Sequence, residues 1–291
     1  MALKITPFYH EDTGTYTYVA ADESTASCAV IDPVMDYEPQ SAKVGYLFID
    51  QIIDFIRQNQ LTNQWILETH AHADHLSAAQ YLKQQVGGKV GIGDTIGKVQ
   101  KVFKHLYNEA NDFSTNGDQF DFLLSDDETI MVGSEPLHVL HTPGHTPACV
   151  SYVTQNAAFV GDTLFAPDVG TARTDFPGGD AETLYTSIQK LLSLPEETAL
   201  YLCHDYPPPT RMPTYRTTVA EQKKLNIHVN ADISKEQFIQ MRRERDAQLQ
   251  SPRLLLPSLQ VNIRAGELPE AESNGVRYLK IPLNQIGANH D

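Results

Sequence analysis

The most constraining feature of this 291-residue chain is the segment ETHAHADH, which places three histidines and an aspartate within six positions. They are His70, His72, Asp74 and His75. Three adjacent imidazoles repel one another when protonated and crowd one another when buried as neutral rings. A divalent cation relieves both problems, because it binds neutral imidazole nitrogens and ionised carboxylate oxygens. The segment therefore predicts a metal site.

Three later segments add candidate ligands, each at the end of an expected strand. LHVLHTPGHT contributes His141, AAFVGDTLF contributes Asp162 and TALYLCHDY contributes His204. Loops at the ends of buried strands converge at one edge of a sandwich, where ligands commonly bind. Residues two apart on a strand share a face, so His70 and His72 leave the strand WILET in the same direction. We therefore expect seven ligand positions: His70, His72, Asp74, His75, His141, Asp162 and His204.

The remaining histidines are not expected to bind metal. His138 is expected on a strand face. His145 is expected to orient a ligand, or to close the HTPGHT turn by hydrogen bonding.

The apolar pattern divides the chain into two similar halves. Each half runs through strands, then a helix, then a further strand, with helices expected over residues 46–60, 76–88 and 181–194. This order suggests two facing sheets with helices outside, an α+β protein built as a four-layer αβ/βα sandwich. Beyond the proline-rich connector PPPTRMP, we expect a helical extension and tail. We assign residues 1–210 to a catalytic domain and residues 211–291 to an extension packed on that domain.

Composition excludes several classes of partner. The net charge of −15 argues against nucleic acid and against anionic membrane surfaces. No apolar run approaches the roughly 20 residues that cross a bilayer, and no secretory signal is visible. The three cysteines, Cys28, Cys149 and Cys203, have no C-x-x-C spacing, which favours a reducing cytoplasmic setting. Cys149 and Cys203 are either redox thiols or, as we favour, small buried residues on strands.

Four separated motifs, THAHADH, HTPGH, GDTLF and CHDY, together resemble the metallo-β-lactamase fold superfamily over roughly residues 1–210. In dinuclear members, the resemblance implies that Asp162 bridges two metals. One metal would be held by His70, His72 and His141, and the other by Asp74, His75 and His204.

The ligand spacing leaves two reactions open. In a two-zinc hydrolase, a bridging hydroxide attacks an ester or thioester. In a one-iron oxygenase, two histidines and one carboxylate bind Fe(II) and leave positions for substrate and O₂. A non-catalytic sensor is disfavoured, because it has no need of an open, reactive coordination sphere.

The surrounding sequence resembles one branch more closely than the other. GTARTDF, from Gly170 to Phe176, and the helix after it resemble persulfide dioxygenases (sulfur dioxygenases) more than hydroxyacylglutathione hydrolase (glyoxalase II). The tail resembles a bacterial β-lactamase-like hydrolase branch associated with sulfide detoxification. The resemblance implies oxidation of glutathione persulfide by O₂ to sulfite and glutathione, with one Fe(II) per chain held by His70, His141 and Asp162. The alternative is a glyoxalase II-like hydrolase of glutathione thioesters with two Zn(II) per chain.

The same resemblance implies roles for further residues. His72, Asp74, His75 and His204 would surround the iron, with Asp74, His75 and Tyr206 taking part in catalysis. Arg173 resembles the family's substrate-contacting arginine and suits a bidentate grip on a glutathione carboxylate. Tyr206 is placed to hydrogen-bond substrate or a ligand. We find no rhodanese segment, so a sulfur-transferase step would need a separate rhodanese, and we expect a homodimer.

Overall fold

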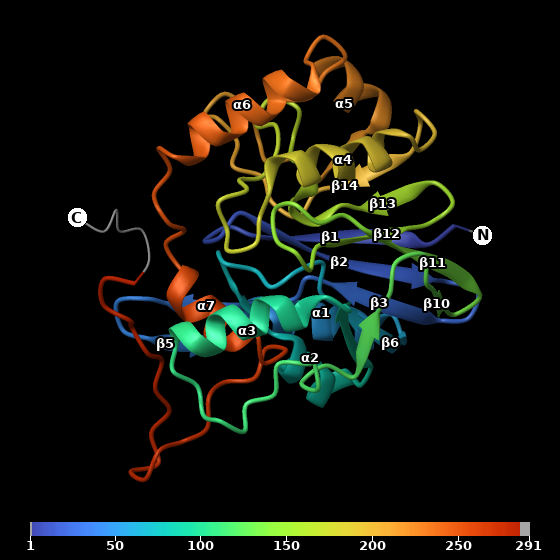
Figure 1. Cartoon of the computed structure of the whole chain (residues 1–291). Helices are drawn as coiled ribbons and strands as arrows, with labels where there is room; N and C mark the ends of the chain where they lie inside the picture. Colours follow the sequence, from blue (N-terminus) through green and yellow to red (C-terminus); the bar gives the residue numbers. More distant parts are fainter. Residues whose placement is uncertain (1, 286–291) are drawn as a thin grey trace.

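The computed structural model describes residues 2–285 and contains two six-stranded sheets that face each other (Figure 1). In the first sheet, the three N-terminal strands are antiparallel neighbours, and the remaining strands join them in parallel. Its strands, in spatial order, are β1 (Lys4–His10), β2 (Thr15–Asp22), β3 (Ser27–Ile31), β6 (Thr62–Leu67), β8 (Lys89–Gly93) and β9 (Phe122–Leu124).

The second sheet is antiparallel except where β13 and β14 pair in parallel. Its strands, in spatial order, are β10 (Thr129–Val132), β11 (Glu135–His141), β12 (Val150–Val153), β13 (Ala157–Phe159), β14 (Ala199–Tyr201) and β15 (Arg216–Thr218). A small third sheet contains β5 (Lys43–Gly45), β4 (Val34–Glu38) and β7 (Leu76–Ser77).

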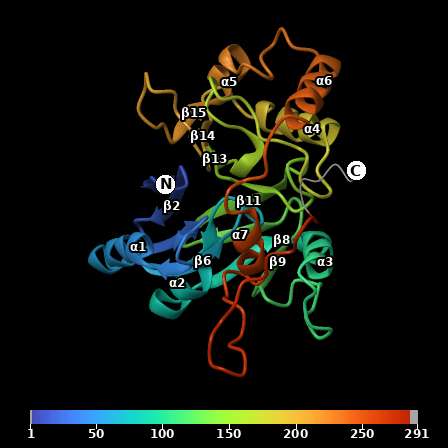
Figure 2. The ribbon, with the colours of Figure 1, turned by 90° about the vertical axis from the view of Figure 1, so that its left-hand side faces the viewer.

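Helices cover the outer face of each large sheet, as Figures 1 and 2 show. The first sheet carries α1 (Leu47–Gln58), α2 (Ala79–Val86) and α3 (Ile96–Leu106). The second carries α4 (Ala181–Leu192), α5 (Val219–Leu225) and α6 (Lys235–Asp246). The predicted αβ/βα sandwich is therefore confirmed. The three predicted helices are one to three residues shorter at five of their six ends. The largest difference is at the start of α2, which begins at Ala79 because Leu76 and Ser77 pair with β4.

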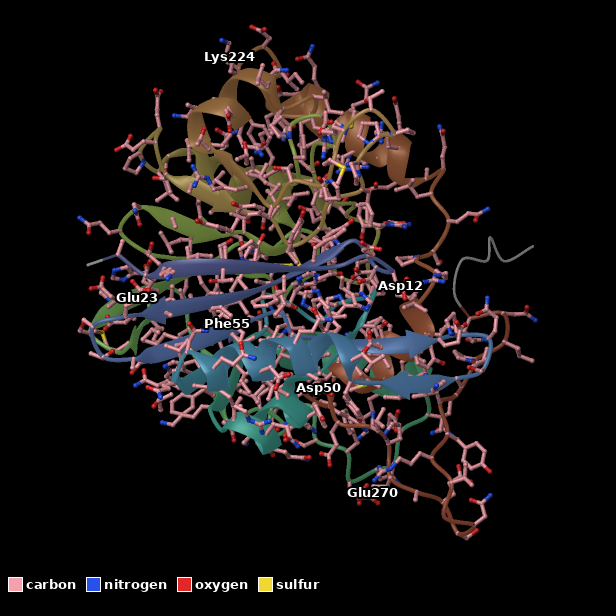
Figure 3. All side chains as sticks on the ribbon, turned by 180° about the vertical axis from the view of Figure 1, so that it is seen from behind. Asp12, Glu23, Asp50, Phe55, Lys224 and Glu270 are labelled. Carbon is pink, nitrogen blue, oxygen red and sulfur yellow. The ribbon has the colours of Figure 1, made fainter. Side chains whose placement is uncertain are left out.

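Three apolar cores hold these layers together. Between the two sheets, side chains such as Tyr18, Ile31 and Tyr152 are at most 1 % exposed. The core under α1 follows from its helical spacing, since Ile49, Ile52, Ile53 and Ile56 are all buried. Phe55 of α1, labelled in Figure 3, also meets Phe8 of β1 with ring centroids 5.4 Å apart. Burial of these faces fixes which edge of the sandwich the strand ends share.

The chain beyond residue 210 packs against both halves of the sandwich. α5 and α6 lie against α4, and α7 (Leu255–Asn262) lies against β7. Figure 3 shows the span of this segment, with Lys224 of α5 and Glu270 of the tail at opposite ends of the molecule. Its apolar side chains join the cores of both halves, Phe238 in one and Leu259 in the other. The division of the chain at residue 210 stays a prediction.

None of the helices within residues 2–285 is long and apolar enough to cross a membrane.

Phe238→Ala tests whether α6 is part of the main core. Phe238 is fully buried beside Tyr185 of α4, with ring centroids 5.5 Å apart. We expect the substitution to lower the free energy of unfolding by about 3–5 kcal/mol, because it removes an aromatic ring and leaves a cavity. Urea unfolding followed by circular dichroism measures the change. Met212→Ala, at a side chain 83 % exposed, is the control and should shift the value by less than about 0.5 kcal/mol. Equal effects of the two substitutions would contradict the prediction.

Candidate metal site

Loops at four strand ends meet at one edge of the sandwich. The segment containing His70 follows β6, and His145 lies in the loop after β11. Asp162 lies in the 3-10 helix η1 (Gly161–Thr163) after β13, and His204 follows β14. These four residues are at most 8 % exposed. The fold therefore brings imidazole and carboxylate groups from distant segments into one buried cluster.

The first donor group consists of His70, His145 and Asp162. The Oδ2 atom of Asp162 lies 3.8 Å from Nε2 of His70 and 3.6 Å from Nε2 of His145. The ligand atoms of the three residues all lie within 4.8 Å of one another. Two imidazole nitrogens and one carboxylate oxygen at this spacing can bind one transition-metal ion.

His141 lies outside this group, and this corrects the predicted ligand set. It is the last residue of β11, where its Nε2 lies 3.0 Å from the carbonyl oxygen of Leu124 and 3.8 Å from the carboxylate of Asp94. His145, which we expected to orient a ligand or to close the turn, instead occupies the position in the cluster that we expected for His141.

The reason for the difference is the turn between the two histidines. Gly144 has a φ of +136°, and a Cβ atom there would lie 2.3 Å from the Cα atom of Leu184 in α4. The turn can pass this close to α4 only with glycine. A histidine before the turn stays within the sheet, whereas one beyond it reaches the edge where the other loops meet. In the sequence, the only indication that His145 belongs to the cluster was its position directly after the Pro143-Gly144 turn.

The second donor group consists of His72, Asp74, His75 and His204. Nε2 of His204 lies 3.2 Å from Oδ2 of Asp74 and 3.3 Å from Oδ1 of Asp162. Asp162 thus turns one carboxylate oxygen toward each group. The structure brings together six of the seven predicted ligand positions, and His145 completes the cluster.

Unpartnered atoms support the fit of a cation. Five buried ligand atoms have no hydrogen-bond partner within the described part of the chain: Nε2 of His70, Nδ1 of His72, Oδ2 of Asp74, Nε2 of His75 and Oδ1 of Asp162. Leaving buried polar atoms unpaired costs about 1–3 kcal/mol each. Such a concentration of free lone pairs matches the ligand preference of a divalent metal ion. The residues therefore fit one or two such ions.

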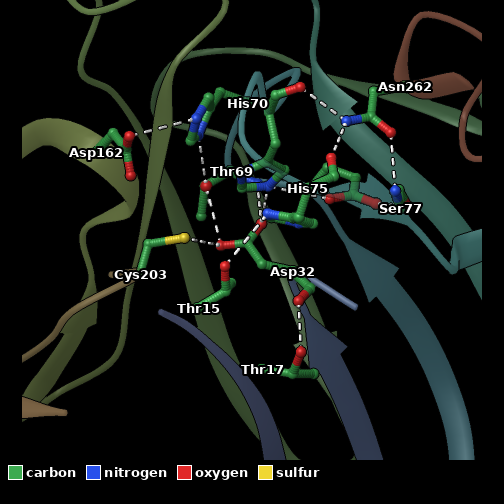
Figure 4. A network of polar contacts seen from close by, with 12 residues as sticks. Thr15, Thr17, Asp32, Thr69, His70, His75, Ser77, Asp162, Cys203 and Asn262 are labelled. Carbon is green, nitrogen blue, oxygen red and sulfur yellow. Dashed lines mark hydrogen bonds and ion pairs between the residues drawn. The ribbon is translucent and has the colours of Figure 1, made fainter. Parts of the chain in front are cut away.

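Hydrogen bonds behind the cluster orient the first group (Figure 4). The hydroxyl of Thr69 donates to Oδ2 of Asp32 over 3.0 Å, so it accepts from Nδ1–H of His70, also over 3.0 Å. Nδ1–H of His145 donates to the carbonyl oxygen of Arg173 over 2.8 Å. Both rings are thereby held with the proton on Nδ1 and the lone pair of Nε2 facing the cluster.

Asp32 and Glu68 support His72, and sequence reasoning did not identify either of them. Nε2 of His72 lies 3.0 Å from Asp32 and 3.3 Å from Glu68. Burial alone would lower the pKa of His72, but these two carboxylates raise it well above its usual value. Both carboxylates lie on the Nε2 side of the ring, so neither of them contacts Nδ1. Asp32 directly follows β3 and precedes Pro33, and this position was the only feature of the sequence that singled it out.

Burial favours the uncharged form of several donors. Desolvation, reinforced by the neighbouring histidines, lowers the pKa of His70 well below its usual value and that of His75 to about 4. Burial likewise lowers the pKa of His145. It raises the pKa of Asp162 to about 6, although His204 opposes the effect. Neutral imidazoles are the form that binds metal, so His70, His75 and His145 are held in that form at neutral pH.

The C-terminal extension also holds the metal-binding loop. Asn262, at the end of α7, donates from Nδ2 to the carbonyl oxygens of His72 and His75, each over 2.8 Å. Its Oδ1 accepts the backbone N–H of Ser77 over 2.8 Å, a bond that is visible in Figure 4. One buried amide thus fixes three backbone groups of this loop. Because Asn262 lies more than 180 residues away in sequence, no local pattern could identify it.

A cavity of about 350 Å³ opens onto the cluster. Asp74, His145 and Asp162 form its inner wall. Tyr206 lines it as well, with its ring stacked on that of His204 at a centroid distance of 5.7 Å. Arg173 lines the cavity too, so Arg173 and Tyr206, the two predicted substrate-binding residues, both border it.

The guanidinium of Arg173 is already paired. It makes two hydrogen bonds of 2.5 Å to the carboxylate of Asp175 and one of 2.7 Å to the carbonyl oxygen of Gln250. A role of Arg173 in gripping a substrate carboxylate stays a prediction, and it would require Asp175 to share the guanidinium.

Cys149 and Cys203 are buried free thiols. Burial raises the pKa of Cys149 to about 12 and that of Cys203 well above its usual value. Thiols held in the neutral form are poor nucleophiles.

Comparison with known proteins agrees with this geometry. The metallo-β-lactamase superfamily model matches residues 11–204. The chain belongs to the metallo-β-lactamase superfamily. The superfamily membership expected from the sequence is therefore confirmed.

Individual relatives carry names of two kinds. Glyoxylase B2 of Dictyostelium discoideum is 52 % identical over 97 % of this chain and 98 % of its own. The human mitochondrial persulfide dioxygenase ETHE1 is 30 % identical over 78 % of this chain and 75 % of its own. The crystal structure of ETHE1 from Myxococcus xanthus superposes with a TM-score of 0.72 at 29 % identity, covering 91 % of this chain and 100 % of that one. These names support an enzyme without defining its reaction.

Paired substitutions test the corrected ligand set. His145→Ala removes a donor of the first group, so we expect the purified protein to lose its bound metal. His141→Ala, four residues earlier, removes an imidazole outside the cluster and should leave the metal content unchanged. Elemental analysis by plasma mass spectrometry after gel filtration measures both. Metal loss in His141→Ala with retention in His145→Ala would restore the original prediction.

A second test concerns Asn262. Asn262→Ala should weaken metal affinity roughly 10- to 100-fold, because substitutions behind the ligands typically have effects of that size. Competition with a coloured chelator measures the affinity. Ser258→Ala is the matched control on the same helix, since the buried Ser258 hydroxyl has no hydrogen-bond partner within the described residues. Equal affinities of the two variants would rule out positioning by Asn262.

Proposed function

We propose that this protein is a mononuclear non-haem Fe(II) persulfide dioxygenase that oxidises glutathione persulfide with O₂ to sulfite and glutathione. The observation that carries the proposal is the first donor group. His70, His145 and Asp162 form a two-histidine, one-carboxylate set, and His145 and Asp162 border the cavity of about 350 Å³. This ligand set is typical of Fe(II) oxygenases that keep open positions for substrate and O₂. The relationship to ETHE1 in sequence and structure supports the same choice.

The overall reaction balances with one water. Glutathione persulfide, O₂ and water give glutathione and sulfurous acid, which ionises to sulfite. The sulfur–sulfur bond breaks, and the thiol sulfur leaves with the electron pair and takes a proton. The persulfide loses four electrons in total, and O₂ accepts them. When bound, Fe(II) supplies the redox chemistry that joins O₂ to the outer sulfur.

The protein's own groups orient the histidine rings and limit the access of water to the cavity. Thr69 and the Arg173 carbonyl hold His70 and His145 with their Nε2 lone pairs toward the cluster. Apolar side chains, Phe165 and Leu249 among them, line the cavity and limit access of water. Tyr206 is 51 % exposed, and in this proposal its hydroxyl hydrogen-bonds the persulfide.

In this proposal the second donor group tunes the iron site. Asp74 borders the cavity, and the charges of His204 and His75 outweigh burial and hold its pKa well below its usual range. Asp74 therefore stays ionised and, with His75, places fixed charge and hydrogen-bonding capacity beside the substrate. A separate rhodanese would supply or take sulfane sulfur. A homodimer and a cytoplasmic location remain proposals.

A dinuclear zinc hydrolase of glutathione thioesters is the second candidate. The intact second group, His72, Asp74, His75 and His204, favours it. So does the two-sided placement of Asp162, because one carboxylate can bridge two ions. The name of the 52 % identical relative, Glyoxylase B2, points the same way.

Asp74→Ala separates the two functions. If the protein is an iron dioxygenase, the wild type should bind about one iron per chain, and Asp74→Ala should retain that iron with reduced activity. If it is a dinuclear hydrolase, Asp74→Ala should lose one metal of two. Metal content is measured beside two assays, O₂ uptake with sulfite formation from glutathione persulfide, and loss of absorbance from S-lactoylglutathione. An iron-loaded wild type that consumes no O₂ but cleaves the thioester would overturn the proposal.

A further inference from the structure

A second cavity, of about 620 Å³, lies beside the cavity at the metal cluster. The two cavities share five lining residues, which are Ala73, His145, Arg173, Leu249 and Pro252. His145 also belongs to the first donor group. The second cavity therefore begins at a candidate metal ligand and adjoins the first cavity there.

The walls of the second cavity are mostly apolar. The ring of His145 lies 6.0 Å from that of Phe176, and Phe176 lies 5.5 Å from Phe103 of α3. Both phenylalanines are buried, so this wall is formed before a ligand binds. The other apolar lining residues are Val102, Leu106, Pro177, Leu249, Pro252 and Leu255. A continuous apolar surface thus runs from the metal ligand His145 toward α3.

Charged groups in this lining neutralise each other. Arg173 is its guanidinium and Asp175 its carboxylate among the described residues, and two hydrogen bonds join them. The other polar side chains in the lining, those of His105, Ser251 and Gln285, belong to exposed residues that can stay hydrated. An apolar group entering here would therefore strip no water from an unpaired charge. A pocket of this size and lining is typical of sites that bind apolar parts of small molecules.

A persulfide leaves this space unfilled, because its reacting end is a single sulfur atom. Two large apolar side chains of the lining also remain accessible to solvent. Val102 is 41 % exposed, and Leu249 is 45 % exposed. Apolar side chains that are gathered in a cavity and left accessible commonly mark a ligand site.

We propose that the second cavity binds an apolar substituent carried on the sulfur of the ligand. The protein then takes S-alkyl, S-aryl or S-acyl derivatives of its thiol carrier in addition to persulfides. This rests on the proposed function in one respect, that the carrier occupies the cavity of about 350 Å³ with its sulfur at the metal cluster. A substituent on that sulfur passes His145 and Ala73 into the second cavity. Ala73 presents only a methyl group at this junction.

Two unreactive thioethers, S-methylglutathione and S-hexylglutathione, test the proposal without requiring either reaction. The hexyl compound has five more methylene groups, and complete burial of one methylene group lowers Kd about fourfold. We expect its Kd for the metal-loaded full chain to be at least about tenfold lower than that of the methyl compound, even with partial burial. Isothermal titration measures both values. The heat-capacity change of binding should also be more negative for the hexyl compound, as burial of apolar surface requires.

Substitutions on α3 locate the bound substituent. Val102→Trp fills the second cavity, so the ratio of the two Kd values should fall below about threefold while Kd for S-methylglutathione stays unchanged. Lys101→Trp is the matched control, because Lys101 is exposed on the same helix and does not line the cavity. This variant should keep the ratio of the wild type. If Val102→Trp does not fold, Val102→Asp decides, because it keeps a similar volume and places a charge in the apolar wall.

Three results would overturn the proposal. They are equal Kd values of the two thioethers for the wild type, the same ratio in the Val102 and Lys101 variants, and no binding of either compound. Failure here is distinct from failure of the dioxygenase proposal. Oxygen uptake with glutathione persulfide, measured on the same iron-loaded protein, tests the reaction and does not depend on the second cavity.

Discussion

The site depends on a single buried carboxylate, that of Asp32. This side chain is 1 % exposed and lies at a φ of +51°, where β3 leaves the sheet. It accepts hydrogen bonds from the backbone and hydroxyl of Thr69 and from Nε2 of His72, and the thiol of Cys203 points to it over 3.4 Å. Burial would raise the pKa of Asp32, but His72 and these donors hold it below its usual value. The ionised carboxylate thus connects the loop after β6 to the loop after β14, and both loops carry candidate metal ligands.

The C-terminal extension also holds the loops that carry the two donor groups. On one side, Asn262 of α7 holds the carbonyl oxygens of His72 and His75. On the other side, Asp246 of α6 accepts the backbone N–H and the hydroxyl of Thr174, next to the carbonyl of Arg173 that orients His145. Each donor group therefore has one support from the sandwich and one from the extension. A metal site held from two directions keeps its geometry when a substrate enters between them.

The sequence predicted the parts of this arrangement that local chemistry determines. His70 and His72 were found from the histidine-rich segment that directly follows β6, and Asp162 and His204 from their positions after strands. His145 was misassigned because it shares the short motif HTPGHT with His141, which ends a strand. The path of the turn between the two histidines depends on the close contact of Gly144 with α4, which the motif does not reveal. Asn262 could not be predicted. Its contacts join segments far apart in the chain, and they exist only after the sheets and the extension have packed.

The candidate metal ligands and part of the cavity lining come from separate parts of the fold. The candidate ligands lie in loops of the two sheets, whereas the chain beyond residue 210 contributes His228, Arg242 and Arg245 to the cavity lining. In either candidate function, the cavity would hold a thiol-derived molecule with its sulfur toward the metal. The two candidate functions differ in the occupancy of the two donor groups around Asp162, since one ion in the first group favours oxygen chemistry and two ions favour attack by hydroxide.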